Sequence, residues 1–332
     1  MPYQNPQTPR FYIDIFSWLK SLGLTHEYGR SRFGLDTSEQ ELVDGQRAIL
    51  LNSAIPFQLD YFAILGHEMA GIAFNGKFAD SPWTNNYYIS NYGVTERINC
   101  DDSSTSSYIP TYNGFSLVKF NQVDIWDSNI THFYYQGDSL ESFKASSFSL
   151  GKTYDMPHSD LKITMSREMD GVKRIRTKGG NDLVKHQYTK PPQWGNSVPW
   201  ELSTSSHQKL ARVGRRTWDM SFTHLQDSDV FPVSELTTGL LTDPDEYTQY
   251  DHYSVIGSGE SVTPYDLLGG NTFYNQVIHK TNGGQLPFLF NSAHPDNNIQ
   301  NFAICKFDMN SFSFQQTSSG LYSCKLKIRE VW

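Results

Sequence analysis

Two stretches of the sequence each match part of a known ligand-binding motif. One is rich in glycine and begins at Gly71, and the other begins at His67. Gly71-Ile-Ala-Phe-Asn-Gly-Lys77 has the glycine and lysine spacing of a phosphate-binding loop. Phe78 follows the lysine, where such a loop needs Ser or Thr to hold magnesium, and Asp80-Ser-Pro82 does not begin a helix that would point at a phosphate. We therefore expect a strand and a turn here, and no nucleotide cofactor.

His67-Glu68 opens the HExxH pattern of zinc proteases, but position 71 is glycine, so the second histidine ligand is missing. Further along the chain, Asp155, His158 and Asp160 lie close together in the sequence around Pro157. A metal or acid–base role for these three would need partners that the sequence does not nominate. We expect a turn at a domain junction instead.

Two pairs of aspartates, Asp227/Asp229 and Asp243/Asp245, have the spacing of paired catalytic carboxylates or of calcium ligands. Both pairs lie beside helix-start or turn residues, where aspartate caps backbone N–H groups, and we favour capping. No GxSxG, CxxC or GxGxxG motif is present. The sequence therefore predicts a protein that is not an enzyme, with no catalytic, cofactor-binding or metal-binding residues.

Exposed aromatic residues offer a different chemistry. Trp83, Tyr87, Tyr88 and Trp126 lie in polar surroundings and could present ring faces to a sugar. The same residue types dominate the binding energy of protein–protein interfaces, so packing against a neighbouring subunit is the alternative that we favour.

The elements that must position these residues are mainly β-strands. Hydrophobic residues make up 38% of the chain but aromatic residues 14%, and Asn, Ser, Thr and Gly are abundant, as in sheets with long polar loops. Runs with strand-like apolar or alternating patterns recur at 47–51, 61–65, 72–74, 115–120, 130–135 and 148–154. One helix is expected at 11–22, where Phe11, Ile15, Trp18, Leu19 and Leu22 share a helical face.

This pattern divides the 332 residues into three parts. Residues 1–40 are expected to hold an extended, proline-containing N-terminal arm (1–10) and the short helix. Residues 41–160 are expected to form a jelly-roll-like β-sandwich, and residues 161–332 a second sandwich- or barrel-like β domain. The second unit contains two long polar stretches, 185–209 and 241–268, and loops of that length are usually functional or ordered by a partner.

Composition limits the location of the protein. No apolar run approaches the length of a membrane span, and the first ten residues lack the basic start and apolar centre of a signal peptide, so we expect no export by the general route. Cys100, Cys305 and Cys324 show no CxxC spacing and are expected to be reduced, structural thiols.

Charge is distributed unevenly along the chain. Residues 167–216 contain eleven Lys or Arg against four Asp or Glu, whereas residues 217–270 contain ten Asp or Glu and no Lys or Arg. The two segments could neutralise one another within one subunit, or a basic face could meet the acidic face of the next copy. Arg215, Arg216, Asp243 and Asp245 are the candidate interface charges. Nucleic acid is not an expected partner, because the acidic stretch would repel phosphate.

The last sixty residues carry the most informative pattern. A short helix at 272–280 stops at Asn282-Gly-Gly284, and strands follow at 286–290, 301–307 and 321–332; the upstream segment 215–222 also has a strand pattern. A tryptophan at the end of an alternating strand indicates a C-terminus held within a sheet.

This block, with its final strand Leu326-Lys-Ile-Arg-Glu-Val331, resembles virion structural proteins of tailed bacteriophages, and the upstream β unit resembles a discoidin-like jelly roll. The resemblance covers roughly 160–332. It implies a non-enzymatic component of the tail, tail tip or an adaptor, assembled in the host cytoplasm, whose partners are other copies in a ring and other virion proteins. The alternatives are a receptor- or glycan-binding phage protein that uses the jelly roll and, third, a glycan-degrading enzyme with carboxylates among 219–266.

Overall fold

The structure is a computed structural model that describes the following parts of the chain. The described residues are 8–23, 26–28, 35, 40–42, 46–50, 58–81, 84–102, 108–111, 113–124, 132–137, 143–145, 147–160, 163–168, 172–186, 214–231 and 271–331.

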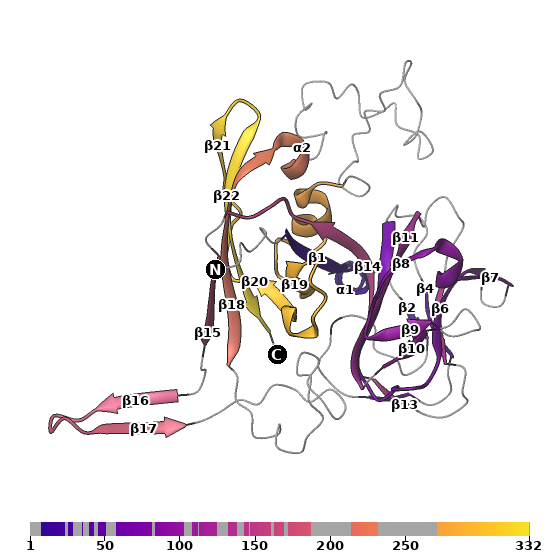
Figure 1. The fold of residues 1–332 in the computed structure, drawn as a ribbon, viewed down its shortest axis with the longest axis horizontal. Coiled ribbons are helices and arrows are strands. Elements are labelled where there is room, and N and C mark those ends of the chain that lie inside the picture. The colour runs from indigo at the N-terminus through magenta and orange to yellow at the C-terminus, as the bar shows by residue number, and fades with distance from the viewer. Residues whose placement is uncertain are drawn as a thin grey trace.

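The largest sheet among these residues has eleven strands and runs through both halves of the chain (Figure 1). From one edge to the other its strands are β15 (Thr164–Glu168), β18 (Arg215–Gln226), β22 (Leu321–Glu330), β20 (Phe302–Phe307), β19 (Phe288–His294), β1 (Thr8–Asp14), β14 (Ser147–Asp155), β5 (Gln58–His67), β11 (Gly114–Asp124) and β8 (Val94–Ile98), and β21 (Phe314–Ser318) also pairs with β22. β1 pairs antiparallel with β14 on one side and with β19 on the other. The first strand therefore joins the two predicted β units into one sheet.

A second sheet packs on the β14–β8 half of the first. Its strands in the described residues are β2 (His26–Tyr28), β4 (Gln46–Leu50), β12 (His132–Gly137), β6 (Phe74–Ser81), β10 (Tyr108–Pro110), β9 (Cys100–Asp102) and, paired with β6, β7 (Thr84–Tyr88). Phe62 of β5 packs on Phe74 of β6, with ring centroids 6.2 Å apart, and Phe120 of β11 packs on Phe78 at the same distance. The chain is thus mainly β with sandwich packing, as the sequence predicted. Two short strands, β3 (Gln40–Leu42) and β13 (Phe143–Ala145), pair separately.

The long sheet curls back on itself. β11 and β20 lie five strand positions apart, about 24 Å in a flat sheet. Nevertheless, the ring centroids of Phe115 on β11 and Phe302 on β20 are only 5.2 Å apart. Tyr12 of β1 packs on both Phe302 and Tyr61 of β5. One of the three hydrophobic cores therefore lies on the inner, concave face of the curled sheet. The other two lie on its outer face.

The predicted C-terminal block is confirmed. A π-helix, η6 (Tyr274–His279), lies in the predicted helical segment, and Asn282, Gly283 and Gly284 then take positive φ angles before β19 begins. β22 lies between β18 and β20 inside the sheet, so the chain end is held there up to Glu330. Cys100, Cys305 and Cys324 are buried free thiols, also as predicted.

The N-terminal prediction was partly wrong. Residues 1–7 lie outside the described part, but Thr8 already begins β1, so residues 8–10 belong to the middle of the sheet and not to an extended arm. The helix predicted at 11–22 is shorter: α1 spans Ile15–Ser21. The Asp14 side chain caps it by accepting a hydrogen bond from the Ser17 backbone N–H at 2.8 Å, and residues 11–14 stay extended in β1.

A hairpin projects from the body of the molecule. β16 (Val172–Arg176) and β17 (Asp182–His186) pair only with each other within the described residues, and they extend away from the large sheet beyond the end of β15 (Figure 1). We call residues 172–186 the arm hairpin. The remaining short helices are η1 (Ile89–Tyr92), α2 (Asp227–Val230) and η7 (Ile299–Asn301), and none of the helices in the described residues is long and apolar enough to cross a membrane.

Candidate functional site

His67 is a buried structural residue. Its Nδ1 accepts a hydrogen bond from the Met69 backbone N–H at 3.3 Å, so the proton of the neutral ring lies on Nε2, which is 3.0 Å from Ser116 Oγ. Burial lowers the pKa of His67 to about 3, so the ring stays neutral. Nε2 donates to the serine hydroxyl and has no lone pair to accept its proton, so this Ser–His contact is not arranged for nucleophilic catalysis.

The glycine-rich stretch is not a phosphate-binding loop. Gly71 lies in a turn with a φ of 79°, and the chain then enters β6 at Phe74. Lys77 pairs with Tyr134 of β12 in the middle of the second sheet. The predicted strand and turn are therefore confirmed.

Asp155, His158 and Asp160 do not converge on one point. Asp155 binds Arg10, the Nδ1 atom of His158 lies 3.4 Å from the Thr8 hydroxyl, and Asp160 accepts from Ser221 and Thr223. Asp155 and His158 therefore fasten the end of β14 and the residues after it to β1, and Asp160 fastens them to β18, which fits the predicted junction turn. No group of three His, Cys, Asp or Glu side chains in the described residues is placed to hold a metal ion.

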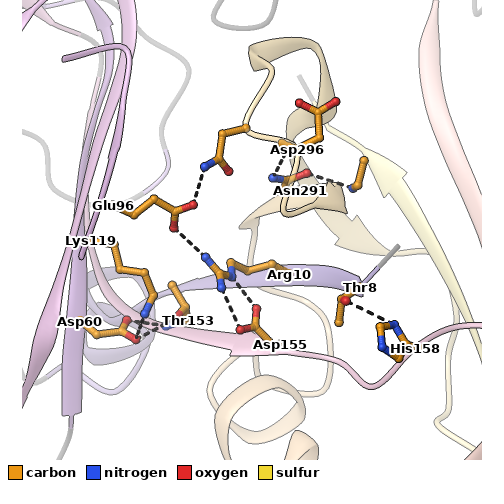
Figure 2. Close-up of polar contacts among 12 residues, drawn as sticks. Thr8, Arg10, Asp60, Glu96, Lys119, Thr153, Asp155, His158, Asn291 and Asp296 are labelled. Atoms are coloured by element: carbon orange, nitrogen blue, oxygen red, sulfur yellow. Dashed lines mark hydrogen bonds and ion pairs between the residues drawn. The ribbon is translucent and has the colours of Figure 1, made fainter. Parts of the chain in front are cut away.

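A cluster of polar side chains is centred on Arg10 of β1 (Figure 2). The Arg10 guanidinium forms a bidentate pair with Asp155, in which Nη2 lies 2.8 Å from Oδ2, and its Nη1 lies 2.7 Å from Glu96 Oε2. The Arg10 side chain is 8% exposed, Glu96 is 16% exposed and Asp155 is half exposed. One cation thus holds two carboxylates at the edge of the core inside the curl.

The Arg10–Glu96 pair acts as a clasp across the curled sheet. β1 and β8 lie four strand positions apart, about 19 Å in a flat sheet, which is more than the two side chains can span. Glu96 also accepts a hydrogen bond from Asn297, in the loop after β19. The cluster therefore ties the edge strand β8, the central strand β1 and this loop together.

The loop after β19 is held by its own polar contacts. Asn291 accepts from the Ala293 N–H at 3.0 Å and donates to the Asp296 carbonyl at 3.1 Å. Beside the cluster, Asp60 accepts from the Thr153 hydroxyl at 2.6 Å and from its N–H at 2.7 Å, and Lys119 Nζ lies 3.4 Å from the same carboxylate. These contacts connect strands to one another and to the loop after β19, so we assign the cluster a structural role.

Arg10 also controls the titration of Asp155. Burial alone would raise the pKa of Asp155, but the hydrogen bond and the charge of Arg10 outweigh it and lower the pKa. A lowered carboxyl pKa stabilises the fold above the pKa of the unfolded chain, and this contribution disappears as the pH falls through the folded value.

Replacing Arg10 with methionine should therefore destabilise the protein by about 2–4 kcal/mol at neutral pH, since it leaves two carboxylates without their cation. The loss should shrink below about pH 4, where free carboxyl groups become protonated. Urea unfolding at several pH values would measure both effects. Arg97→Met is the matched control, because the Arg97–Asp102 pair is more exposed, at 35% and 57%, and should contribute little. Equal losses for the two variants would contradict the clasp.

The predicted aromatic sites are mostly outside the described part. Trp83 and Trp126 lie outside it, as do the side chains of Tyr87 and Tyr88, whose backbones belong to β7 and pair with β6. Glycan or subunit contact through these residues stays a prediction.

Of the candidate interface charges, Asp243 and Asp245 also lie outside the described residues. Arg215 is half-buried at the start of β18. Arg216 requires a correction: its side chain is 9% exposed and forms an ion pair with Glu330, which is 3% exposed. The Arg216 side chain is therefore buried within its own subunit and is not an exposed interface charge.

Sequence reasoning missed Arg10, because the prolines at positions 2, 6 and 9 indicated an extended arm. The alternation of Arg10, Tyr12 and Asp14 with Phe11 and Ile13 is the signal that could have identified β1 and its polar face.

Comparison with known proteins adds little. No family model and no curated protein matches the chain. Among solved structures, a chitosan-binding module of a chitosanase/glucanase from Paenibacillus covers 39% of this chain and 93% of its own, with 9% identity and a TM-score of 0.24. A DUF4466 family protein from Parabacteroides merdae covers 92% of this chain and 98% of its own, with 11% identity and a TM-score of 0.17. At these TM-scores neither likeness bears on fold or function.

Proposed function

We propose that this chain is a non-enzymatic structural component of a tailed-phage particle and acts by binding other copies of itself and other virion proteins. The observation that carries the proposal is the arm hairpin. Its described side chains are exposed at nearly every position, including Ile175 at 62% and Leu183 at 61%. Apolar residues held out in solvent on a projecting element are typical of a surface that a partner covers.

The energetics of a lone hairpin favour the same conclusion. A two-stranded hairpin is at best marginally stable in water, because it lacks a third strand or a helix to bury its apolar side chains. Ile175 and Leu183 lie directly opposite each other in the β16–β17 register. Fully burying such side chains contributes about 1.5–3 kcal/mol each, so a partner surface would both stabilise the hairpin and be bound by it.

The edge strand β15 of the large sheet offers a second exposed surface to a partner. In the described residues β15 pairs only with β18, and Met165 on this edge strand is 55% exposed. An edge strand has unpaired backbone groups that accept another strand. β15 leads directly toward the arm hairpin in the chain, so backbone pairing and apolar contacts are available side by side.

Assembly of the purified full-length chain is the test. Light scattering after size-exclusion chromatography should give one mass that is a whole-number multiple of the subunit, and negative-stain electron microscopy should show closed rings. A chain that remains monomeric throughout a concentration series would overturn the proposal.

A further inference from the structure

The arm hairpin has more cations than its own carboxylate can pair. It contains Lys or Arg at positions 173, 174, 176, 178 and 185, but Asp182 is its one acidic residue. Asp182 binds Arg174, and Arg176 Nε lies 3.8 Å from its Oδ1. Lys173, Lys178 and Lys185 have no ion-pair partner within the described residues.

Two of these lysines, Lys173 and Lys185, share a face with the exposed aliphatic pair Ile175 and Leu183. In the register of the hairpin Lys173 lies opposite Lys185, and Ile175 opposite Leu183. Alternate residues of a strand point to the same side, so these four side chains form one face. Two like charges directly opposite each other are unfavourable unless an anion lies between or above them. The face therefore suits a partner that presents carboxylates next to apolar or aromatic groups.

The same chain contains a segment with that chemistry. Residues 232–270 include seven Asp or Glu, no Lys or Arg, and tyrosines at positions 247, 250, 253 and 265. We call residues 232–270 the acidic segment. Its formal charge of −7 is opposite in sign to the +4 of the arm hairpin, and every copy contains both segments.

The arm hairpin and α2, which precedes the acidic segment in the chain, lie beyond opposite ends of β18. In the chain the arm hairpin lies between β15 and β18, and α2 follows the other end of β18, far from the hairpin (Figure 1). The acidic segment follows α2 in the sequence. β18 has twelve residues, which span about 40 Å. Contact between the hairpin of one copy and the acidic segment of another would be head-to-tail, and contacts of this type generate rings or filaments.

We propose that the Lys173–Ile175–Leu183–Lys185 face of the arm hairpin binds the acidic segment of a second copy of this chain. The inference rests on the proposed assembly function and names the contact by which assembly occurs. An anionic membrane or a nucleic acid would also attract the lysines, but neither accounts for the paired aliphatic residues and the acidic, tyrosine-rich segment together.

A fluorescently labelled peptide of residues 241–268 tests the contact directly. Its binding to the full-length chain, followed by fluorescence anisotropy, should weaken about tenfold or more in Lys173→Glu/Lys185→Glu, since two attractions become repulsions. Lys306→Glu/Lys325→Glu, which makes the same charge change on β20 and β22, should bind like the wild type. Circular dichroism would verify that both variants are folded.

Mixing two variants distinguishes contact between copies from contact within one chain. The arm variant alone and Asp243→Lys/Asp245→Lys alone should each assemble poorly, but a mixture should recover complexes that contain both chains. Absence of mixed complexes would overturn the inference, as would peptide binding that is indifferent to the arm change. Binding of the arm to vesicles of anionic phospholipid or to an oligonucleotide, without peptide binding, would also overturn it. Rings that persist in the arm variant would remove this contact but leave the assembly function standing, whereas a wild-type chain that neither assembles nor binds the peptide would remove both.

Discussion

Gly151→Ala is expected to destabilise the fold severely. Gly151 lies in β14, where it pairs with Asp14 of β1 on one side and with Tyr61 of β5 on the other. A Cβ atom added at this position would lie 1.8 Å from the Ile13 carbonyl oxygen and 3.2 Å from the Ile15 N–H nitrogen. Both are backbone atoms at the point where β1 ends and α1 begins, so no side-chain rotation relieves the clash.

The expected loss exceeds about 3 kcal/mol, the upper end of ordinary overpacking, because β1 must move away from β14. β1 is the strand that joins both halves of the large sheet, and natural domains are stable by only about 5–15 kcal/mol. Thermal unfolding and the yield of soluble protein would measure the effect. Gly179→Ala is the matched control, since the added methyl group meets no atom within 4 Å in the turn of the arm hairpin. A Gly151→Ala protein as stable as the control would show that β1 does not approach β14 so closely.

Local patterns predicted the last sixty residues well. The helix, its glycine-containing stop and the alternating strands are encoded in neighbouring residues, and the structure places η6, β19, β20 and β22 where the pattern indicated. The broken phosphate-loop motif was also interpreted correctly, since a missing Ser or Thr is visible in the sequence itself.

The N-terminal strand was not predicted because two local signals were misleading. Prolines indicated an extended arm, yet Pro9 lies at a β-bulge, where the register of β1 against β19 shifts between Thr8 and Arg10. A bulge is a position where a strand tolerates the missing N–H of proline. The helical spacing that begins at Phe11 was partly coincidental, and Asp14, the true N-cap, marked the start of α1.

The Arg10 clasp depends on the curl of the sheet, which no short window of sequence encodes. Arg10 and Glu96 are 86 residues apart, and their contact follows from the way that β1, β14, β5, β11 and β8 bend around a shared core. Periodicity could place both residues in strands and on a face, but the approach of the two faces is a property of the whole sheet.

The largest effect of a single charge change is expected at Arg216 and Glu330. Both side chains are buried, and they join β18 to β22 by hydrogen bonds from Arg216 N to Glu330 Oε2 at 2.9 Å and from Nε to the same oxygen at 3.2 Å. Arg216 Nη2 also donates to the Phe302 carbonyl of β20 at 2.6 Å, and the guanidinium lies 5.1 Å from the Trp218 ring centroid. One guanidinium thus connects three strands.

Arg216→Met should destabilise the protein by about 3–5 kcal/mol, because it leaves the Glu330 carboxylate buried without its cation. Glu330→Met should cost a similar amount for the opposite reason. The double variant should lose much less than the sum, since an apolar pair of similar volume needs no compensating charge. Urea unfolding of the four proteins forms a double-mutant cycle that isolates the pair.

Lys327→Met is the control on the same strand, β22. Lys327 pairs with Asp308 at 2.6 Å, but the two side chains are 44% and 38% exposed, so solvent screens their attraction and the loss should be far smaller. If Arg216→Met cost no more than Lys327→Met, or if the two buried substitutions were additive, the pair would not hold the three strands together. The same burial explains why reversing Arg216 cannot probe an interface between copies: its loss would act on the fold of the subunit before any contact with a neighbour.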